Sequence, residues 1–131
     1  MLENREGQCV PDVTFHVREG SRWKEITTRE LFGGKRVVVF SLPGAFTPTC
    51  SASHVPRYEE LAPELRRRGV DEIVCLSVND AFVMDAWRDQ EGARSIRFLQ
   101  DGNGEITEKM GMLVDKQELR YGRRYRRYSR L

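Results

Sequence analysis

Two apolar segments separated by an amphipathic one constrain the fold of this chain more than any other feature. Residues 36–42 read RVVVFSL and residues 72–78 read EIVCLSV. Short runs rich in β-branched residues are typical of strands buried within a sheet. Between the two runs, apolar side chains recur every three or four residues, the spacing of a helix that packs one face on a sheet. The pattern predicts a strand–helix–strand unit.

The rest of the chain adds strands and helices joined by short links. Residues 13–17 and 23–26 flank a glycine turn and predict an N-terminal β-hairpin. Asp80 is placed to cap a helix that begins at residue 81. This alternation predicts an α/β fold with a largely parallel sheet covered on both faces. Three shorter elements are also expected: a helix capped by Thr27 and Glu30, a strand at residues 96–99, and a helix at residues 106–110.

Length and charge narrow the class of protein. The 131 residues suit a single domain over residues 1–131. Lys and Arg number 22 against 20 Asp and Glu, so the net charge of +2 indicates neither nucleic acid nor a membrane as partner. No stretch approaches the length of a membrane-spanning helix, and the N-terminus lacks the apolar core of a signal peptide. We therefore expect a cytoplasmic protein, whose thiols stay reduced unless they do redox work.

The three cysteines stand in different contexts. Cys50 ends the segment PGAFTPTC, residues 43–50, and stands where the amphipathic helix begins. Backbone N–H groups and the helix dipole at that point favour a thiolate, the nucleophilic form of cysteine. Cys75 lies inside a predicted buried strand and is expected to be a core residue. Cys9 has no evident role, although partnership with Cys50 stays open.

Metal binding is not expected. His54 lies four residues after Cys50, but a metal site needs three or four ligands and the chain has only two histidines. Packing or hydrogen bonding near Cys50 is the expected role of His54. No other cofactor is implied.

Residues 43–50 resemble the Pro-xxx-Thr-xx-Cys active-site signature of the peroxiredoxins, a family of the redoxin superfamily. The segment FSLPGAFT, residues 40–47, is similar to the peroxiredoxin-5-like branch, which includes the bacterial peroxiredoxin–glutaredoxin hybrid proteins. The similarity covers nearly the whole chain and implies a thioredoxin-like fold, with a mixed central sheet flanked by helices. Three further segments match in order: LSVNDAFV at residues 76–83, DGNG at residues 101–104 and GMLV at residues 111–114.

The resemblance implies a thiol-dependent peroxidase that reduces hydrogen peroxide and small alkyl hydroperoxides. Cys50 would be the peroxidatic cysteine, which becomes a sulfenic acid. Thr47 would place its hydroxyl beside the sulfur and orient the peroxide, and Pro43 would form a rigid apolar wall. Structural roles stay open at both positions, because Thr47 can cap the helix and Pro43 can end the preceding strand.

The resemblance also implies an essential arginine. The family's arginine stands in an Arg-aromatic-Ser context, which residues 127–129 match. The guanidinium of Arg127 would stabilise the thiolate and the charge that develops on the leaving oxygen. Two alternatives stay open: Arg126 fills this role, or Arg127 is one of the solvated arginines of the basic segment at residues 120–130.

Partners follow from the same resemblance. Relatives that use a resolving cysteine carry it beyond the end of this chain, and Cys75 is expected to be too buried to reach Cys50. The sulfenic acid would then be captured by glutathione, with glutaredoxin (or thioredoxin) as reductant. Relatives also form homodimers through segments near Phe46 and Phe82. They continue past Leu131 with further strands and a helix, so the domain is expected to lack these last elements.

Two other functions stay open. The chain can be a non-enzymatic, truncated thioredoxin-fold module that senses redox state or binds a partner through Cys50. Alternatively, the arginines of residues 120–130 can bind nucleic acid or an anionic surface, in which case binding would weaken steeply with salt.

Overall fold

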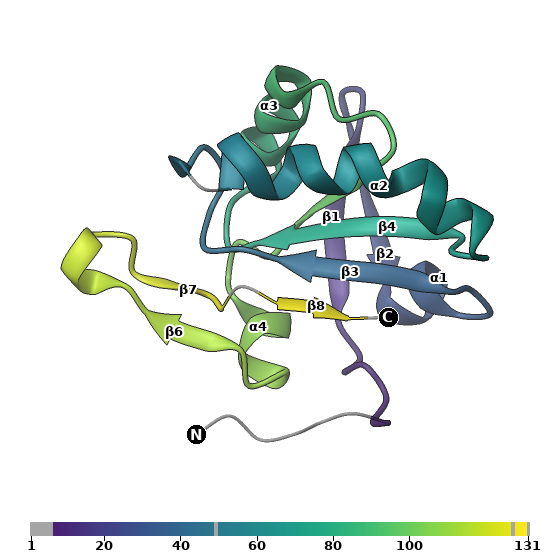
Figure 1. Cartoon of the computed structure of the whole chain (residues 1–131). Coiled ribbons are helices and arrows are strands. Elements are labelled where there is room, and N and C mark those ends of the chain that lie inside the picture. The colour runs from purple at the N-terminus through teal and green to yellow at the C-terminus, as the bar shows by residue number, and fades with distance from the viewer. Residues whose placement is uncertain (1–6, 49, 127, 131) are drawn as a thin grey trace.

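A four-stranded sheet forms the centre of the protein, with helices and two β-hairpins packed around it (Figure 1). The computed structural model describes residues 7–48, 50–126 and 128–130. Within the sheet, β3 pairs in parallel with β4 and β4 with β5, whereas β8 pairs antiparallel with β3. The mixed central sheet is therefore confirmed. In spatial order its strands are β5 (Arg97–Gln100), β4 (Glu72–Ser77), β3 (Val37–Ser41) and β8 (Tyr128–Arg130).

Two antiparallel hairpins complete the strands. The predicted N-terminal hairpin is confirmed as β1 (Thr14–Glu19) and β2 (Arg22–Thr27), which are joined by a tight turn. The second hairpin, β6 (Leu113–Asp115) and β7 (Arg123–Tyr125), extends beside the edge of the sheet where β3 and β4 end (Figure 1). The helical elements are α1 (Thr28–Phe32), a π-helical turn (Cys50–His54), α2 (Val55–Arg67), α3 (Ala81–Glu91), α4 (Glu105–Lys109) and a 3₁₀ turn (Gln117–Leu119).

Side chains alternate between the two faces of the central strands and build two cores. On the face covered by α2 and α3, Phe40 and Cys75 pack with Trp87. On the opposite face, Val74 and Leu76 pack with residues from β1, α1 and α4. The central strands are thus buried on both sides, which is why their sequences are almost continuously apolar.

The predicted helix caps form as expected. Thr27 Oγ1 accepts a hydrogen bond from the Glu30 backbone N–H at 3.2 Å, which fixes the start of α1. Asp80 Oδ1 accepts one from the Val83 N–H at 2.9 Å at the start of α3. The strand expected at residues 96–99 and the helix expected at residues 106–110 are both present, each displaced by one residue at its boundaries.

No helix among the described residues is long and apolar enough to span a membrane.

Candidate active site

Cys50 is the first residue of the π-helical turn that continues into α2. Its side chain is fully buried, at 0% exposure, in the core between the sheet and helices α2 and α3. The chain reaches this point from β3 through residues 43–48, here named the Cys50 loop. Cys50 therefore lies beyond the carboxyl end of a central strand, as the sequence predicted.

Backbone and side-chain hydrogen bonds shape the Cys50 loop from within. The Thr47 hydroxyl donates to the Gly44 carbonyl at 2.7 Å, and the Ser51 N–H donates to the Thr47 carbonyl at 3.0 Å. Between Gly44 and Thr47, Phe46 adopts a left-handed backbone conformation with φ of 62°, which is unusual for a residue with a side chain. The loop is thus a tight turn that places Thr47 close in sequence and space to the start of the helical segment.

Asn79 anchors the Cys50 loop to the end of β4. Its Oδ1 accepts hydrogen bonds from the Ala45 N–H at 3.0 Å and from the Ser77 hydroxyl at 2.6 Å. Because β3 and β4 are parallel, the segments that follow them meet at the same edge of the sheet. The loop therefore has a fixed position relative to the sheet.

A second contact holds the other side of Cys50. The Trp87 indole Nε1–H of α3 donates to the Ser51 hydroxyl at 2.9 Å. Trp87 itself is fully buried. The residue that follows Cys50 is thereby tied to α3, and Cys50 lies between two anchored segments.

His54 contributes to an aromatic cluster next to Cys50, as expected. Its ring centroid lies 5.1 Å from that of Phe40 and 5.5 Å from that of Tyr58. Phe40 and Tyr58 stack on each other, with centroids 3.9 Å apart. No group of three or more potential metal ligands occurs in the part of the chain that the structure describes.

Of the two remaining predicted site residues, Pro43 and Arg127, the structure describes only Pro43. Pro43 is half-buried at the start of the Cys50 loop. Arg127 lies outside the described residues. The described residues on either side of that position lie at the end of β3, because the Ser41 hydroxyl donates to the Arg126 carbonyl at 2.8 Å and Tyr128 pairs with Ser41 in the sheet.

The burial predicted for Cys75 is confirmed, and the structure adds that Cys9 lies at the surface. Cys9 is exposed, whereas Cys75 is fully buried in β4. Burial raises the pKa of the Cys75 thiol well above its ordinary value, and the Coulombic interaction with Cys50 raises it further. Cys75 therefore stays protonated where an exposed thiol ionises.

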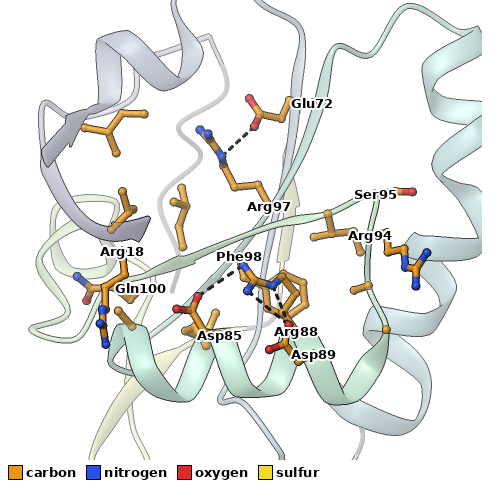
Figure 2. A pocket seen from close by; sticks show the side chains of 18 of the residues that line it. Arg18, Glu72, Asp85, Arg88, Asp89, Arg94, Ser95, Arg97, Phe98 and Gln100 are labelled. Carbon is orange, nitrogen blue, oxygen red and sulfur yellow. Dashed lines mark hydrogen bonds and ion pairs between the residues drawn. The ribbon is translucent and has the colours of Figure 1, made fainter. Parts of the chain in front are cut away.

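A surface groove lies away from this site. It has a volume of about 770 Å³ and is bordered by the β1–β2 hairpin, α3 and β5 (Figure 2). Its carboxylates pair largely within the groove: Arg88 contacts Asp85 at 3.6 Å and Asp89 at 3.4 Å, and Arg97 contacts Glu72 at 3.2 Å. None of the described residues that line the groove belongs to the Cys50 loop.

A cysteine at the start of a helical segment, beyond the carboxyl end of a central strand, is typical of thiol-based redox proteins. The Redoxin family matches residues 5–130 of the chain. The chain belongs to this family and, within it, to the peroxiredoxins.

Individual relatives support this assignment. Hybrid peroxiredoxin hyPrx5 of Haemophilus influenzae is 58% identical over 130 residues, which cover 99% of this chain and 54% of the relative. Peroxiredoxin sll1621 of Synechocystis is 57% identical over 129 residues, which cover 92% of this chain and 68% of the relative. The chain thus spans about half the length of the hybrid protein.

Solved structures confirm the thioredoxin-like fold that the resemblance implied. Reduced Prx3 from Vibrio vulnificus in complex with hydrogen peroxide has a TM-score of 0.92 at 41% identity, covering 97% of this chain and 80% of that one. Peroxiredoxin 5 from Alvinella pompejana has a TM-score of 0.87 at 33% identity, covering 97% and 81%.

Three residues with side-chain hydrogen bonds around the Cys50 loop were not predicted: Asn79, Ser51 and Arg124, whose Nη1 donates to the Val78 carbonyl at 2.7 Å. The position of Asn79, directly after the apolar run 72–78, is a signal that the sequence contains, because polar residues at strand ends commonly face a site. The hydrogen bond from Trp87 to Ser51 joins two helical segments, and the spacing of residues in the sequence does not predict it. Arg124 is hidden among the many arginines of residues 120–130.

The raised pKa of Cys75 predicts how stability depends on pH. The pKa of Cys75 in the folded state exceeds the unfolded value of about 8.5. The contribution of the protonated Cys75 thiol to the unfolding free energy is therefore fully present below pH ~8.5, and it is lost as the pH rises toward the folded-state pKa. Above pH ~9 we expect the unfolding free energy of the wild type to fall, relative to Cys75→Ala, by up to about 1.4 kcal/mol per pH unit. Urea unfolding at several pH values measures this difference. Cys9→Ala, at an exposed thiol, should keep the wild-type slope, and equal slopes for Cys75→Ala and wild type would contradict the assignment.

Proposed function

We propose that this chain reduces hydrogen peroxide and small alkyl hydroperoxides through Cys50. The thiolate sulfur attacks one oxygen of the peroxide, so that an S–O bond forms while the O–O bond breaks. The second oxygen leaves, takes up a proton and becomes water or an alcohol, and Cys50 is left as a sulfenic acid. The position of Cys50 carries this proposal, because it begins a helical segment at the edge of the sheet with its preceding loop anchored to Asn79.

Three further residues are proposed to act with Cys50. The Thr47 hydroxyl donates to the Gly44 carbonyl, and its oxygen lone pairs remain able to accept a hydrogen bond from a peroxide. Pro43 at the start of the loop supplies a rigid wall without an N–H group. The Arg127 guanidinium stabilises the negative charge on the sulfur and on the leaving oxygen. The Vibrio vulnificus Prx3 solved with hydrogen peroxide supports a peroxide site in this fold.

Substitutions at these positions test the proposal. We expect Cys50→Ser to abolish the reaction with hydrogen peroxide. Thr47→Val and Arg127→Gln should each slow it by on the order of 10²–10³-fold, because each removes a polar contact to the reacting oxygens. Stopped-flow kinetics of peroxide consumption give the second-order rate constants, and Cys9→Ser should react at the wild-type rate.

A slow wild type would change the conclusion. If Cys50 of the folded wild type reacts with hydrogen peroxide no faster than an unfolded thiol, the peroxidase is excluded. The non-enzymatic alternative, a redox sensor or partner-binding module, would then remain, and mixed disulfides between Cys50 and a partner protein would support it.

We further propose that glutathione recycles Cys50, with glutaredoxin (or thioredoxin) as the protein reductant. The sulfenic acid condenses with one glutathione thiol, releasing water and forming a mixed disulfide, and a second thiol then displaces Cys50 and yields a disulfide. The burial of Cys75 supports an external thiol, as does the similarity to a hybrid peroxiredoxin. Such recycling needs a reducing compartment, so we place the protein in the cytoplasm, which fractionation of the host cells would test.

Turnover assays distinguish the reductants. With hydrogen peroxide present, we expect steady-state turnover with glutathione and glutaredoxin, and mass spectrometry should find glutathione attached to Cys50 when glutaredoxin is left out. Cys75→Ala should turn over like the wild type. A disulfide between Cys50 and Cys75, or turnover that needs Cys75, would contradict this route.

We also propose that two copies of the chain form a homodimer through the segments near Phe46 and Phe82. Phe46 is 45% exposed and Phe82 57% exposed, and large exposed aromatic side chains favour contact with a partner. Sedimentation velocity should show a dimer for the wild type and a monomer for Phe82→Asp. A monomeric wild type would contradict the proposal.

A further inference from the structure

Arg124 of β7 reaches from its hairpin to the edge of the sheet where the Cys50 loop lies. Its Nη1 donates to the Val78 carbonyl, just beyond the end of β4, at 2.7 Å. Its Nε donates to the Tyr121 carbonyl at 2.7 Å, which fixes the side chain against its own hairpin. The guanidinium is therefore held at two points, and the planar fork of arginine suits this double contact.

Gly44 of the Cys50 loop leaves the space that this guanidinium occupies. A Cβ atom at position 44 would lie 3.2 Å from Arg124 Nη1 and 3.8 Å from its Cζ. It would also lie 3.4 Å from Thr47 Cγ2. The backbone at Gly44 does not have a positive φ, so alanine can adopt its conformation. A side chain at position 44 would therefore press on Arg124, which would have to shift by a few tenths of an ångström.

These contacts connect Arg124 to the residues proposed to meet the peroxide. Gly44 is both the residue beneath the guanidinium and the acceptor of the Thr47 hydroxyl bond. The next residue, Ala45, is bound to Asn79, which directly follows the Val78 carbonyl that Arg124 holds. The β6–β7 hairpin, the end of β4 and the Cys50 loop therefore meet at one guanidinium.

We infer that Arg124 is a positioning residue of the active site, which packs on Gly44 and holds the Cys50 loop against the end of β4. Arg124 acts through Gly44 and Thr47 and does not itself touch the peroxide. The inference rests on the proposed peroxidase function for its effect on rate, but the placement of the loop can be measured without that function. A misplacement of reacting groups by about 1 Å can slow a reaction by on the order of 10²-fold.

A double-mutant cycle between Arg124→Met and Gly44→Ala tests the contact. We expect each single variant to slow the oxidation of Cys50 by hydrogen peroxide by on the order of 10²-fold, because each displaces the loop. The double variant should oxidise Cys50 at nearly the same rate as Arg124→Met alone, since the methyl group added at position 44 no longer meets a guanidinium. Arg124→Lys should restore only part of the rate, because one ammonium cannot hold both carbonyls and also lie flat on Gly44. Arg123→Met, whose side chain pairs with Glu108 instead, is the matched control and should react like the wild type.

Two readouts separate failure of this inference from failure of the proposed function. Alkylation of Cys50 by iodoacetamide should not slow in Arg124→Met, because alkylation needs no oriented peroxide. Amide hydrogen exchange at Ala45 and Ser51 should accelerate in Arg124→Met and in Gly44→Ala, even if the wild type proves unreactive toward peroxide. Gly44→Ala keeps the test readable if Arg124→Met fails to fold. An unchanged rate of Cys50 oxidation together with unchanged amide exchange in Arg124→Met would overturn the inference. So would an equal fold-loss in that rate when Gly44→Ala is introduced into the wild type and into Arg124→Met.

Discussion

The parallel pairing of β3 with β4 is the contact on which the site depends. It aligns Val37 with Glu72 and Ser41 with Leu76, so the two strands end at the same edge of the sheet. Only because of this register does the Ala45 N–H reach the Asn79 side chain. A slip of one residue would exchange the side chains of the two cores and separate the loop from its anchor.

Two cysteines of the same core occupy different positions in this fold, and we expect them to differ in chemistry. Cys75 sits in the middle of β4, paired on one side with β3 and on the other with β5, and burial holds its thiol protonated. Cys50 is equally buried, but it begins a helical segment whose flanking residues are held by side-chain hydrogen bonds.

Hydrophobic pattern and cap chemistry were sufficient to predict much of the fold. The apolar runs around Val38 and Val74, the Thr27 and Asp80 caps and the N-terminal hairpin are all set by local sequence. The same signals place Cys50 at the start of the helical segment. By contrast, the contacts of Asn79 and Arg124 with the loop depend on the sheet register, which joins residues more than thirty positions apart. No local pattern encodes such contacts, and a segment crowded with arginines conceals the one that packs on Gly44.

If the fold activates Cys50 selectively, mass spectrometry of the reduced chain after brief oxidation should reveal it. The chain is treated with one equivalent of hydrogen peroxide and quenched at short times, and oxidation is then assigned to individual cysteine peptides. We expect rapid oxidation confined to Cys50, with the exposed Cys9 and the buried Cys75 still reduced. Oxidation of Cys9 at the same rate as Cys50, or faster, would show that the site does not activate its cysteine.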